Sequence, residues 1–175
     1  MIKITVPLID RELKKLKAGD EVLITGTLYL ARDAAHQRLV ELIKKKKPLP
    51  FDPKGQIVFY AGPSPAKPGS AIGAIGPTSS YRMDDYTIPL LKKGLKGIIG
   101  KGDRAPFIYQ AMKKHKAVYF VAIGGVAALL SKKVMSSCVI AYEDLGAEAI
   151  RRIEVRDFPI IVAQDVKGKN ILKRT

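Results

Sequence analysis

Cysteine, histidine and tryptophan are scarce in this chain of 175 residues, which has one cysteine, two histidines and no tryptophan. The single thiol of Cys138 excludes an internal disulfide, and it cannot hold an iron–sulfur cluster, which usually needs three or four thiolates. Two histidines without a cysteine cluster also argue against a self-contained metal site. We therefore expect no metal ligands in this chain, and we interpret Cys138, Met112 and Met135 as packing residues of the core.

Long apolar segments are also missing. The longest apolar run, residues 117–130, is interrupted by Gly124 and Gly125 and is too short to span a bilayer. Residues 1–6 alternate between apolar and polar side chains, which is typical of a strand and not of a signal peptide. We therefore expect a cytoplasmic protein with no membrane partner.

Acidic residues are few: 16 stand against 31 basic ones, which gives a formal net charge of +15. Such a balance suits nucleic acid, an acidic protein or an anionic substrate. The densest basic run, Lys44 to Lys47, is more typical of a solvated helix end, where cations also favour the helix dipole. No zinc-finger spacing or aromatic RNA-binding motif accompanies it. A nucleic-acid-binding module stays the non-enzymatic alternative.

The hydrophobic pattern predicts strands and helices in alternation, hence an α/β (mixed α+β) class in a single domain over residues 1–175. The expected strands are 1–6, 21–30, 56–61, 95–100, 117–123, 150–155 and 160–165. The expected helices are 31–46, a helix capped by Ser79 or Ser80 and closed by Gly94, 103–115 and 126–133. Within the second of these helices, Pro89 should produce a kink or an early end. The long loop over residues 62–76 is of the kind that often carries function.

Basic residues follow predicted strands in three places. In the first, residues 31–36 (ARDAAH), Arg32 and His36 lie four positions apart at a helix start, where free N–H groups favour an anion. A surface Arg32 paired locally with Asp33 explains the same pattern equally well. The spacing alone leaves both readings open.

The second place, residues 76–84, has the sequence GPTSSYRMD. Gly76 frees the backbone, and three hydroxyl groups then approach a helix start together with Arg82. An arginine in that position can bind a carboxylate through two parallel hydrogen bonds. Helix capping by Ser79 or Ser80 accounts for one hydroxyl, but not for Thr78 and Arg82 together.

The third place, residues 100–104 (GKGDR), puts Lys101 between two glycines after an apolar strand. Five residues separate Gly94 from Gly100, and a glycine follows Lys101, so the P-loop pattern fails. The dinucleotide fingerprint fits formally but lacks the acidic residue about twenty positions later. Lys101 instead suits a point charge close to a substrate carboxylate. Together the three places predict a site for a small anion.

Residues 76–84 and 100–104 resemble the signature of the class I iron–sulfur fumarase and L-tartrate dehydratase family. Residues 31–36 resemble a third block of this family, and residues 142–150 (YEDLGAEAI) and 157–159 (DFP) resemble the end of the same unit. The resemblance implies a swivelling β/β/α domain of the β-subunit type. It also implies an α-subunit partner whose three cysteines carry a [4Fe–4S] cluster, in a heterotetramer of two α and two β subunits.

The activity that this resemblance implies is reversible hydration of fumarate to (S)-malate, or dehydration of L-tartrate or another hydroxy-diacid. The cluster of the partner would act as a Lewis acid on the substrate. Thr78 would take part in the proton transfer, and Arg32, Arg82 and Lys101 would hold the two carboxylates. Three residues would orient the arginines, namely Asp33, His36 and Asp84. Three more would lie around the same site, namely Gly76, Ser79 and Asp103.

Overall fold

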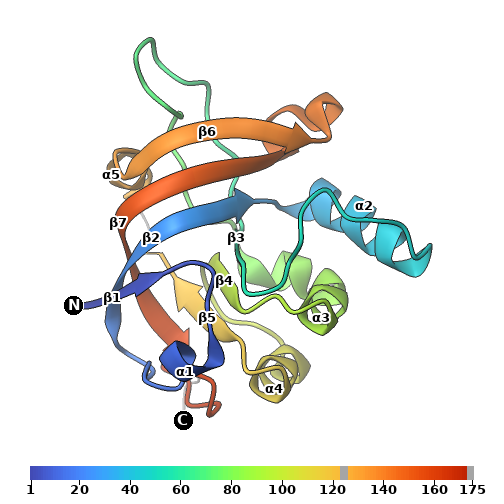
Figure 1. Cartoon of the computed structure of the whole chain (residues 1–175), viewed down its shortest axis with the longest axis vertical. Coiled ribbons are helices and arrows are strands. Elements are labelled where there is room, and N and C mark those ends of the chain that lie inside the picture. The colour runs from blue at the N-terminus through green and yellow to red at the C-terminus, as the bar shows by residue number, and fades with distance from the viewer. Residues whose placement is uncertain (123–125, 173–175) are drawn as a thin grey trace.

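The computed structural model describes residues 1–122 and 126–172, and its seven strands form one sheet that closes on itself (Figure 1). The strands are β1 (Ile2–Thr5), β2 (Glu21–Leu30), β3 (Ile57–Phe59), β4 (Gly97–Gly100), β5 (Val118–Val121), β6 (Val134–Ala141) and β7 (Ile150–Gln164). β2, β3, β4 and β5 pair in parallel in that order. β7 pairs antiparallel with both β5 and β2 and closes a small barrel. β1 pairs with β2, and β6 pairs with β7.

Helices cover one side of this barrel. α2 (Asp33–Lys44), α3 (Asp84–Lys92) and α4 (Pro106–Lys114) lie next to one another there (Figure 1). The shorter helices are α1 (Asp10–Leu13) and α5 (Ala127–Ser131), with the 3-10 helices η1 (Ser80–Met83) and η2 (Glu143–Glu148). The mixed α/β class predicted from the sequence is confirmed.

Two hydrophobic cores lie on the two faces of the strands. In β3 and just after it, Ile57 and Phe59 pack in the core that β1, β2 and β7 share, whereas Val58 and Tyr60 pack in the core beneath α2, α3 and α4. This alternation follows from the two-residue repeat of a strand. Both faces are therefore apolar, as expected for strands buried on both sides.

Most predicted elements are found close to their expected bounds. α2 and α4 lie within the predicted helices, and β2 has the predicted limits. The last residue of the strand expected at 117–123 lies outside the described residues, as do Gly124 and Gly125. The helix expected after Ser80 forms as η1 followed by α3, and α3 continues past Pro89 to Lys92. Of the two effects expected at Pro89, a kink or an early end, the early end does not occur.

The prediction for the last part of the chain was also wrong. Instead of two short strands, β7 runs unbroken over fifteen residues, and β6, which was not predicted, pairs along its first half. Residues 156–159, which were expected to separate the two strands, belong to β7, whose pairing with β2 shifts register between Ile24 and Gly26. Met112 is buried as predicted, whereas Met135 and Cys138 of β6 are exposed.

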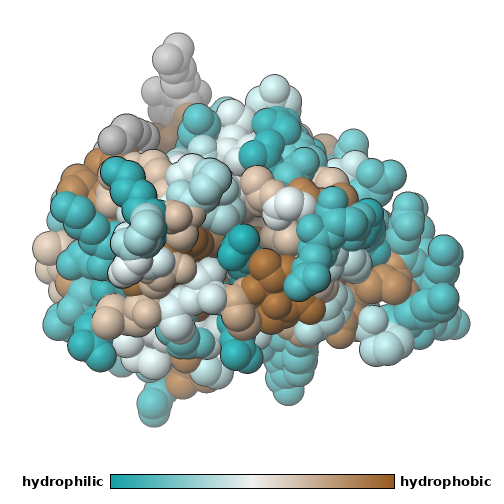
Figure 2. Space-filling model, turned by 90° about the horizontal axis from the view of Figure 1, so that it is seen from above, coloured by the Kyte–Doolittle hydropathy of each residue, from teal (hydrophilic) through white to brown (hydrophobic). Residues whose placement is uncertain are grey.

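The lysine run lies at the C-terminal end of α2, and all four lysines are exposed. Figure 2 shows mainly hydrophilic side chains at the end of the molecule where α2 lies in Figure 1. The interpretation of this run as a solvated helix end is therefore confirmed. Within the described residues, no helix is both long enough and apolar enough to cross a bilayer.

Candidate functional site

The three blocks predicted to form an anion site all follow parallel strands that are neighbours in the sheet. Arg32 follows β2, Thr78 follows the loop after β3, and Lys101 directly follows β4. The carboxyl ends of parallel strands meet at one edge of a sheet, so these blocks converge. The Thr78 N–H donates to the Tyr60 carbonyl at 2.7 Å, and Ser79 forms a parallel bridge with Lys101.

Asp33, the first residue of α2, joins two of the predicted arginines. Its carboxylate accepts hydrogen bonds from Nε and Nη2 of Arg82 at 2.8 and 2.9 Å, and from Nε of Arg32 at 3.3 Å. Burial acts to raise the pKa of Asp33, but hydrogen bonds from its own backbone N–H, Arg32 and Arg82 outweigh burial and lower that pKa. Asp33 therefore stays ionised and holds two guanidinium groups from distant segments side by side.

Both guanidinium groups can still be reached from solvent. The side chains are 26% exposed for Arg32 and 41% exposed for Arg82. A guanidinium has five N–H donors, and Asp33 takes two from Arg82. The remaining donors of Arg82 are available to a ligand carboxylate.

Glu148, at the end of η2, is a member of this cluster that the sequence analysis did not single out. Its carboxylate lies 3.5 Å from Nε of Arg32 and accepts a hydrogen bond from the Ala34 N–H at 3.3 Å. The Glu148 carboxylate thus satisfies the free N–H of Ala34 at the start of α2, where the helix dipole also favours a negative charge. Glu148 lies within residues 142–150, and the resemblance of this block to the family was the only feature of the sequence that could have pointed to Glu148.

A buried ion pair lies beneath the converging blocks. Arg104 is 4% exposed, and its Nε donates to Asp84 at 2.8 Å while Nη2 donates to the Thr87 hydroxyl at 2.7 Å. Its guanidinium lies over the rings of Tyr60 and Tyr119. The structure therefore places Asp84 against Arg104, and not against Arg32 or Arg82 as the sequence had suggested. The sequence analysis had singled out Asp84, but it had not predicted that Arg104 is its partner.

The Ser80 side chain does not cap a helix, although one of the predictions had it do so. No side-chain cap forms at η1, and the Ser80 hydroxyl instead accepts from the Lys101 N–H at 3.1 Å and from the Tyr119 hydroxyl at 2.8 Å. Gly100 makes this approach possible, because a Cβ there would lie 1.9 Å from the Ser80 oxygen. Ser80 thus fixes the start of the 101–104 loop to the 78–82 segment.

His36 is completely buried in α2, next to Tyr60 and Tyr86. Its Nδ1 lies 2.8 Å from the Arg32 carbonyl, and because a carbonyl can only accept, Nδ1 carries the proton. Nε2 is buried without a partner among the described residues. Burial lowers the pKa of His36 to about 4, so the ring is neutral and supports the backbone of Arg32.

The other predicted residues lie at the edge of this arrangement. The Asp103 carboxylate accepts from the Arg104 N–H at 2.8 Å and from the Tyr109 hydroxyl, and it contacts none of the three basic residues of the predicted site. Gly76 is half-buried, and a Cβ there would lie 3.4 Å from Ala127, which is an ordinary contact. Lys101 is exposed, and Thr78 is half-buried.

The arrangement is suited to an anion such as a carboxylate. Arg32 and Arg82 supply two positive charges, and Asp33 keeps the two arginines together. Within residues 1–122 and 126–172, no group of three or more His, Cys, Asp and Glu side chains could hold a metal ion. The donor set of this chain therefore does not fit an iron–sulfur cluster.

Removing Arg104 should destabilise the fold strongly. In an Arg104→Met variant, the Asp84 carboxylate stays buried without its counter-charge, and we expect a loss of about 3–5 kcal/mol in the free energy of unfolding. Arg38→Met is the matched control, because the Arg38–Asp144 pair is exposed and should contribute little to the free energy of unfolding. Urea unfolding followed by circular dichroism measures both, and equal losses would contradict the structural role of Arg104.

His36 should make the stability depend on pH. Its pKa is about 4 in the folded protein and about 6.5 when unfolded, so the unfolded chain binds more protons between these values. The free energy of unfolding should be unaffected by His36 above pH 6.5 and should fall by about 3 kcal/mol as the pH drops to about 4. His36→Asn keeps an N–H donor without titrating and should flatten this slope between pH 6.5 and 5. His115→Asn is the control and should retain most of the pH dependence of the free energy of unfolding.

Comparison with known proteins places the whole chain in one family. A family model described as "Fumarase C-terminus" matches residues 1–175. "Fumarate hydratase 2" of Leishmania major is 36% identical over 99% of this chain, which covers 31% of that protein. "Fumarate hydratase class I, anaerobic" of Escherichia coli is 38% identical over 93% of this chain, which covers 30% of that protein. "L(+)-tartrate dehydratase subunit beta" of E. coli is 33% identical over 97% of this chain.

The lengths of these relatives differ. The chain spans about a third of the two fumarate hydratases but 85% of the E. coli tartrate dehydratase subunit. The family match and the identities above 30% agree with the resemblance carried by residues 31–36, 76–84 and 100–104. By its full-length match, this chain belongs to the fumarase C-terminus family.

Proposed function

We propose that this chain is the substrate-binding β subunit of a hydro-lyase that acts on a four-carbon dicarboxylic acid, most simply fumarate and (S)-malate. The observation that carries the proposal is the pairing of Arg32 and Arg82 through Asp33. Family membership supports it, because relatives are named fumarate hydratase and L(+)-tartrate dehydratase. Dehydration of L-tartrate is the second candidate, because a relative that is 33% identical is named L(+)-tartrate dehydratase subunit beta.

In this proposal the basic residues bind and orient the acid. Arg82, held by Asp33, offers its remaining N–H donors to one carboxylate as a planar fork. Arg32 and Lys101 bind the other negative charge, Lys101 as a point charge at the end of β4. The buried Arg104 network beneath them keeps these groups in place without contacting the acid.

Thr78 is our candidate for the proton transfer. In the dehydration direction, a proton leaves the carbon next to the hydroxyl-bearing carbon, and the substrate hydroxyl leaves as water. Thr78 would act as a relay: its oxygen would accept the proton from carbon while its own hydroxyl proton passes to a water molecule, so that the side chain stays neutral. An alcohol is a weak base unless its surroundings favour the transfer. The Thr78 N–H donates to the Tyr60 carbonyl, and this bond fixes the backbone from which the hydroxyl extends.

The proposed assembly includes a second chain. We propose that an α subunit holds a [4Fe–4S] cluster, which would supply Lewis-acid chemistry at the substrate hydroxyl when bound. The single, exposed Cys138 of this chain cannot supply the thiolates. A cytoplasmic heterotetramer of two α and two β subunits, with residues 1–175 as one domain, completes the proposal.

Arg82 tests the proposed site. In the complex with the cluster-bearing subunit, Arg82→Ala should lower kcat/KM for fumarate by about 100-fold or more, because a bidentate contact to the substrate is lost. Arg38→Ala removes an arginine that pairs with Asp144 elsewhere on the surface, and it should leave kcat/KM within about twofold. Size-exclusion chromatography should show that both variants still assemble. Full activity of assembled Arg82→Ala would refute the site.

A further inference from the structure

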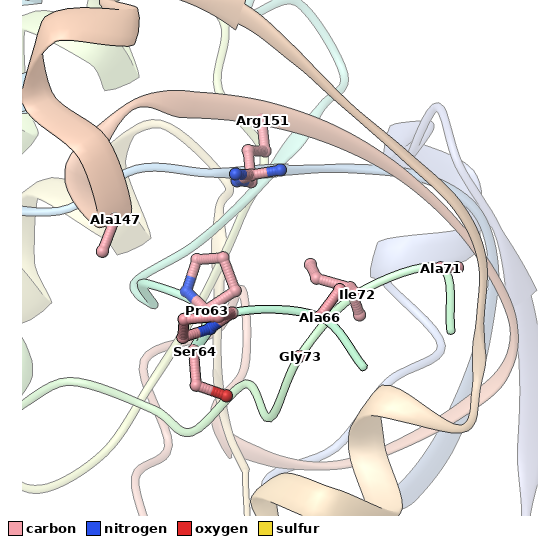
Figure 3. Close-up of a pocket in the computed structure, with 9 residues that line it drawn as sticks. Pro63, Ser64, Ala66, Ala71, Ile72, Gly73, Ala147 and Arg151 are labelled. Atoms are coloured by element: carbon pink, nitrogen blue, oxygen red, sulfur yellow. The ribbon is translucent and has the colours of Figure 1, made fainter. Parts of the chain in front are cut away.

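The loop between β3 and η1 folds back on itself and forms a pocket against the start of β7 (Figure 3). The Ser64 N–H donates to the Ala74 carbonyl at 3.0 Å, and the Ala74 N–H donates to the Ser64 hydroxyl at 2.9 Å. A Cβ on Gly73 would lie 1.9 Å from the Ser64 carbonyl oxygen, so the two arms of the loop touch. The pocket, of about 210 Å³, is therefore formed before any ligand enters.

The walls of this pocket are small and mainly apolar, with a single charge. The apolar residues that line it are Pro63, Pro65, Ala66, Ala71, Ile72 and Ala147. Among the described lining residues, Arg151 is the one that carries a charge. Figure 3 shows its guanidinium above Pro63, across the space from Ile72.

The guanidinium of Arg151 has no hydrogen-bond acceptor in the described part of the chain. Its Nε is buried and makes no hydrogen bond, and none of the ion pairs among the described residues includes it. Arg32, Arg38, Arg82 and Arg104, in contrast, each contact a carboxylate. A guanidinium does not lose its proton, and a buried N–H without an acceptor is costly. The pocket therefore contains a donor that lacks its partner.

We propose that this pocket binds a small organic acid with one carboxylate and a short aliphatic body. One guanidinium balances one negative charge, and its planar fork matches a carboxylate. The apolar walls suit the few carbon atoms for which the volume leaves room. A dianion would place its second charge against proline and alanine side chains, which is unfavourable.

The pocket is separate from the site formed by Arg32, Arg82 and Lys101. None of Arg32, Arg82 and Lys101 is among the described residues that line the pocket. Gly62 lies next to both places, because a Cβ there would lie 3.3 Å from Cδ of Arg32 and 2.8 Å from the carbonyl oxygen of Ala147, which lines the pocket. The proposal stands independently of the hydro-lyase function.

Nuclear magnetic resonance of the Nε–H groups of arginine tests this proposal directly. Butyrate is titrated into the ¹⁵N-labelled full-length chain, and butyramide serves as a neutral probe of similar shape. Butyrate should produce a saturable shift of the Arg151 Nε resonance, with a Kd on the order of millimolar, and butyramide should not. Arg151→Met lacks this resonance, so its binding is followed on the backbone amide resonances of the pocket residues Ser64 and Ile72, and it should weaken butyrate binding by about tenfold or more.

Two control variants sharpen the outcome. Arg152→Met removes the exposed arginine that follows Arg151 on β7. Arg82→Met removes an arginine that we propose binds the dicarboxylic acid. In both variants the Arg151 Nε resonance should still shift with butyrate. No saturable shift of the wild-type Arg151 resonance up to about 100 mM butyrate would overturn the proposal, even if Arg151→Met fails to fold. An equal response to butyramide, or loss of the response in Arg82→Met, would overturn it as well.

Discussion

The buried pair of Arg104 and Asp84 is the interaction on which the candidate site depends. A charge in this position is tolerated only with a full set of partners, and Asp84, Thr87 and Tyr60 provide them. Asp84 also accepts from the Ala105 N–H, so the pair joins the start of α3 to the start of α4. Arg82 lies in η1 just before α3, and Lys101 lies between β4 and α4, so both residues are close in sequence to the two helix starts that the pair joins.

Above this core, carboxylates of the chain itself decide how its positive charge is used. A formal net charge of +15 would spread exposed arginines apart, but Asp33 holds Arg32 and Arg82 at one place, and Glu148 adds a second negative charge beside Arg32. The lysines after α2 are solvated and lie outside this cluster. The charge proposed to bind the substrate is thus a small part of the net charge of +15, held in place by Asp33.

Sequence patterns predicted the elements that carry the site but not all of its contacts. The two-residue and 3.6-residue repeats are local, so β2, α2 and α4 could be located, together with the blocks around Arg32, Thr78 and Lys101. Contacts between distant segments leave no such repeat, which is why Glu148 and the partner of Asp84 were missed. β6 was missed because its weakly patterned residues are exposed at the sheet edge, and β7 was divided because Asp157 and Pro159 are typical of turns.

The proposed hydro-lyase activity requires two chains, and a reconstitution experiment tests this requirement most directly. This chain and a cluster-bearing α subunit are purified separately without oxygen, and fumarate hydration is assayed for each alone and for the mixture. We expect no activity from either chain and saturable activity from the mixture, rising to a plateau at an equimolar ratio. Activity of this chain alone would contradict the account, as would an inactive mixture on fumarate, malate and tartrate with the cluster intact.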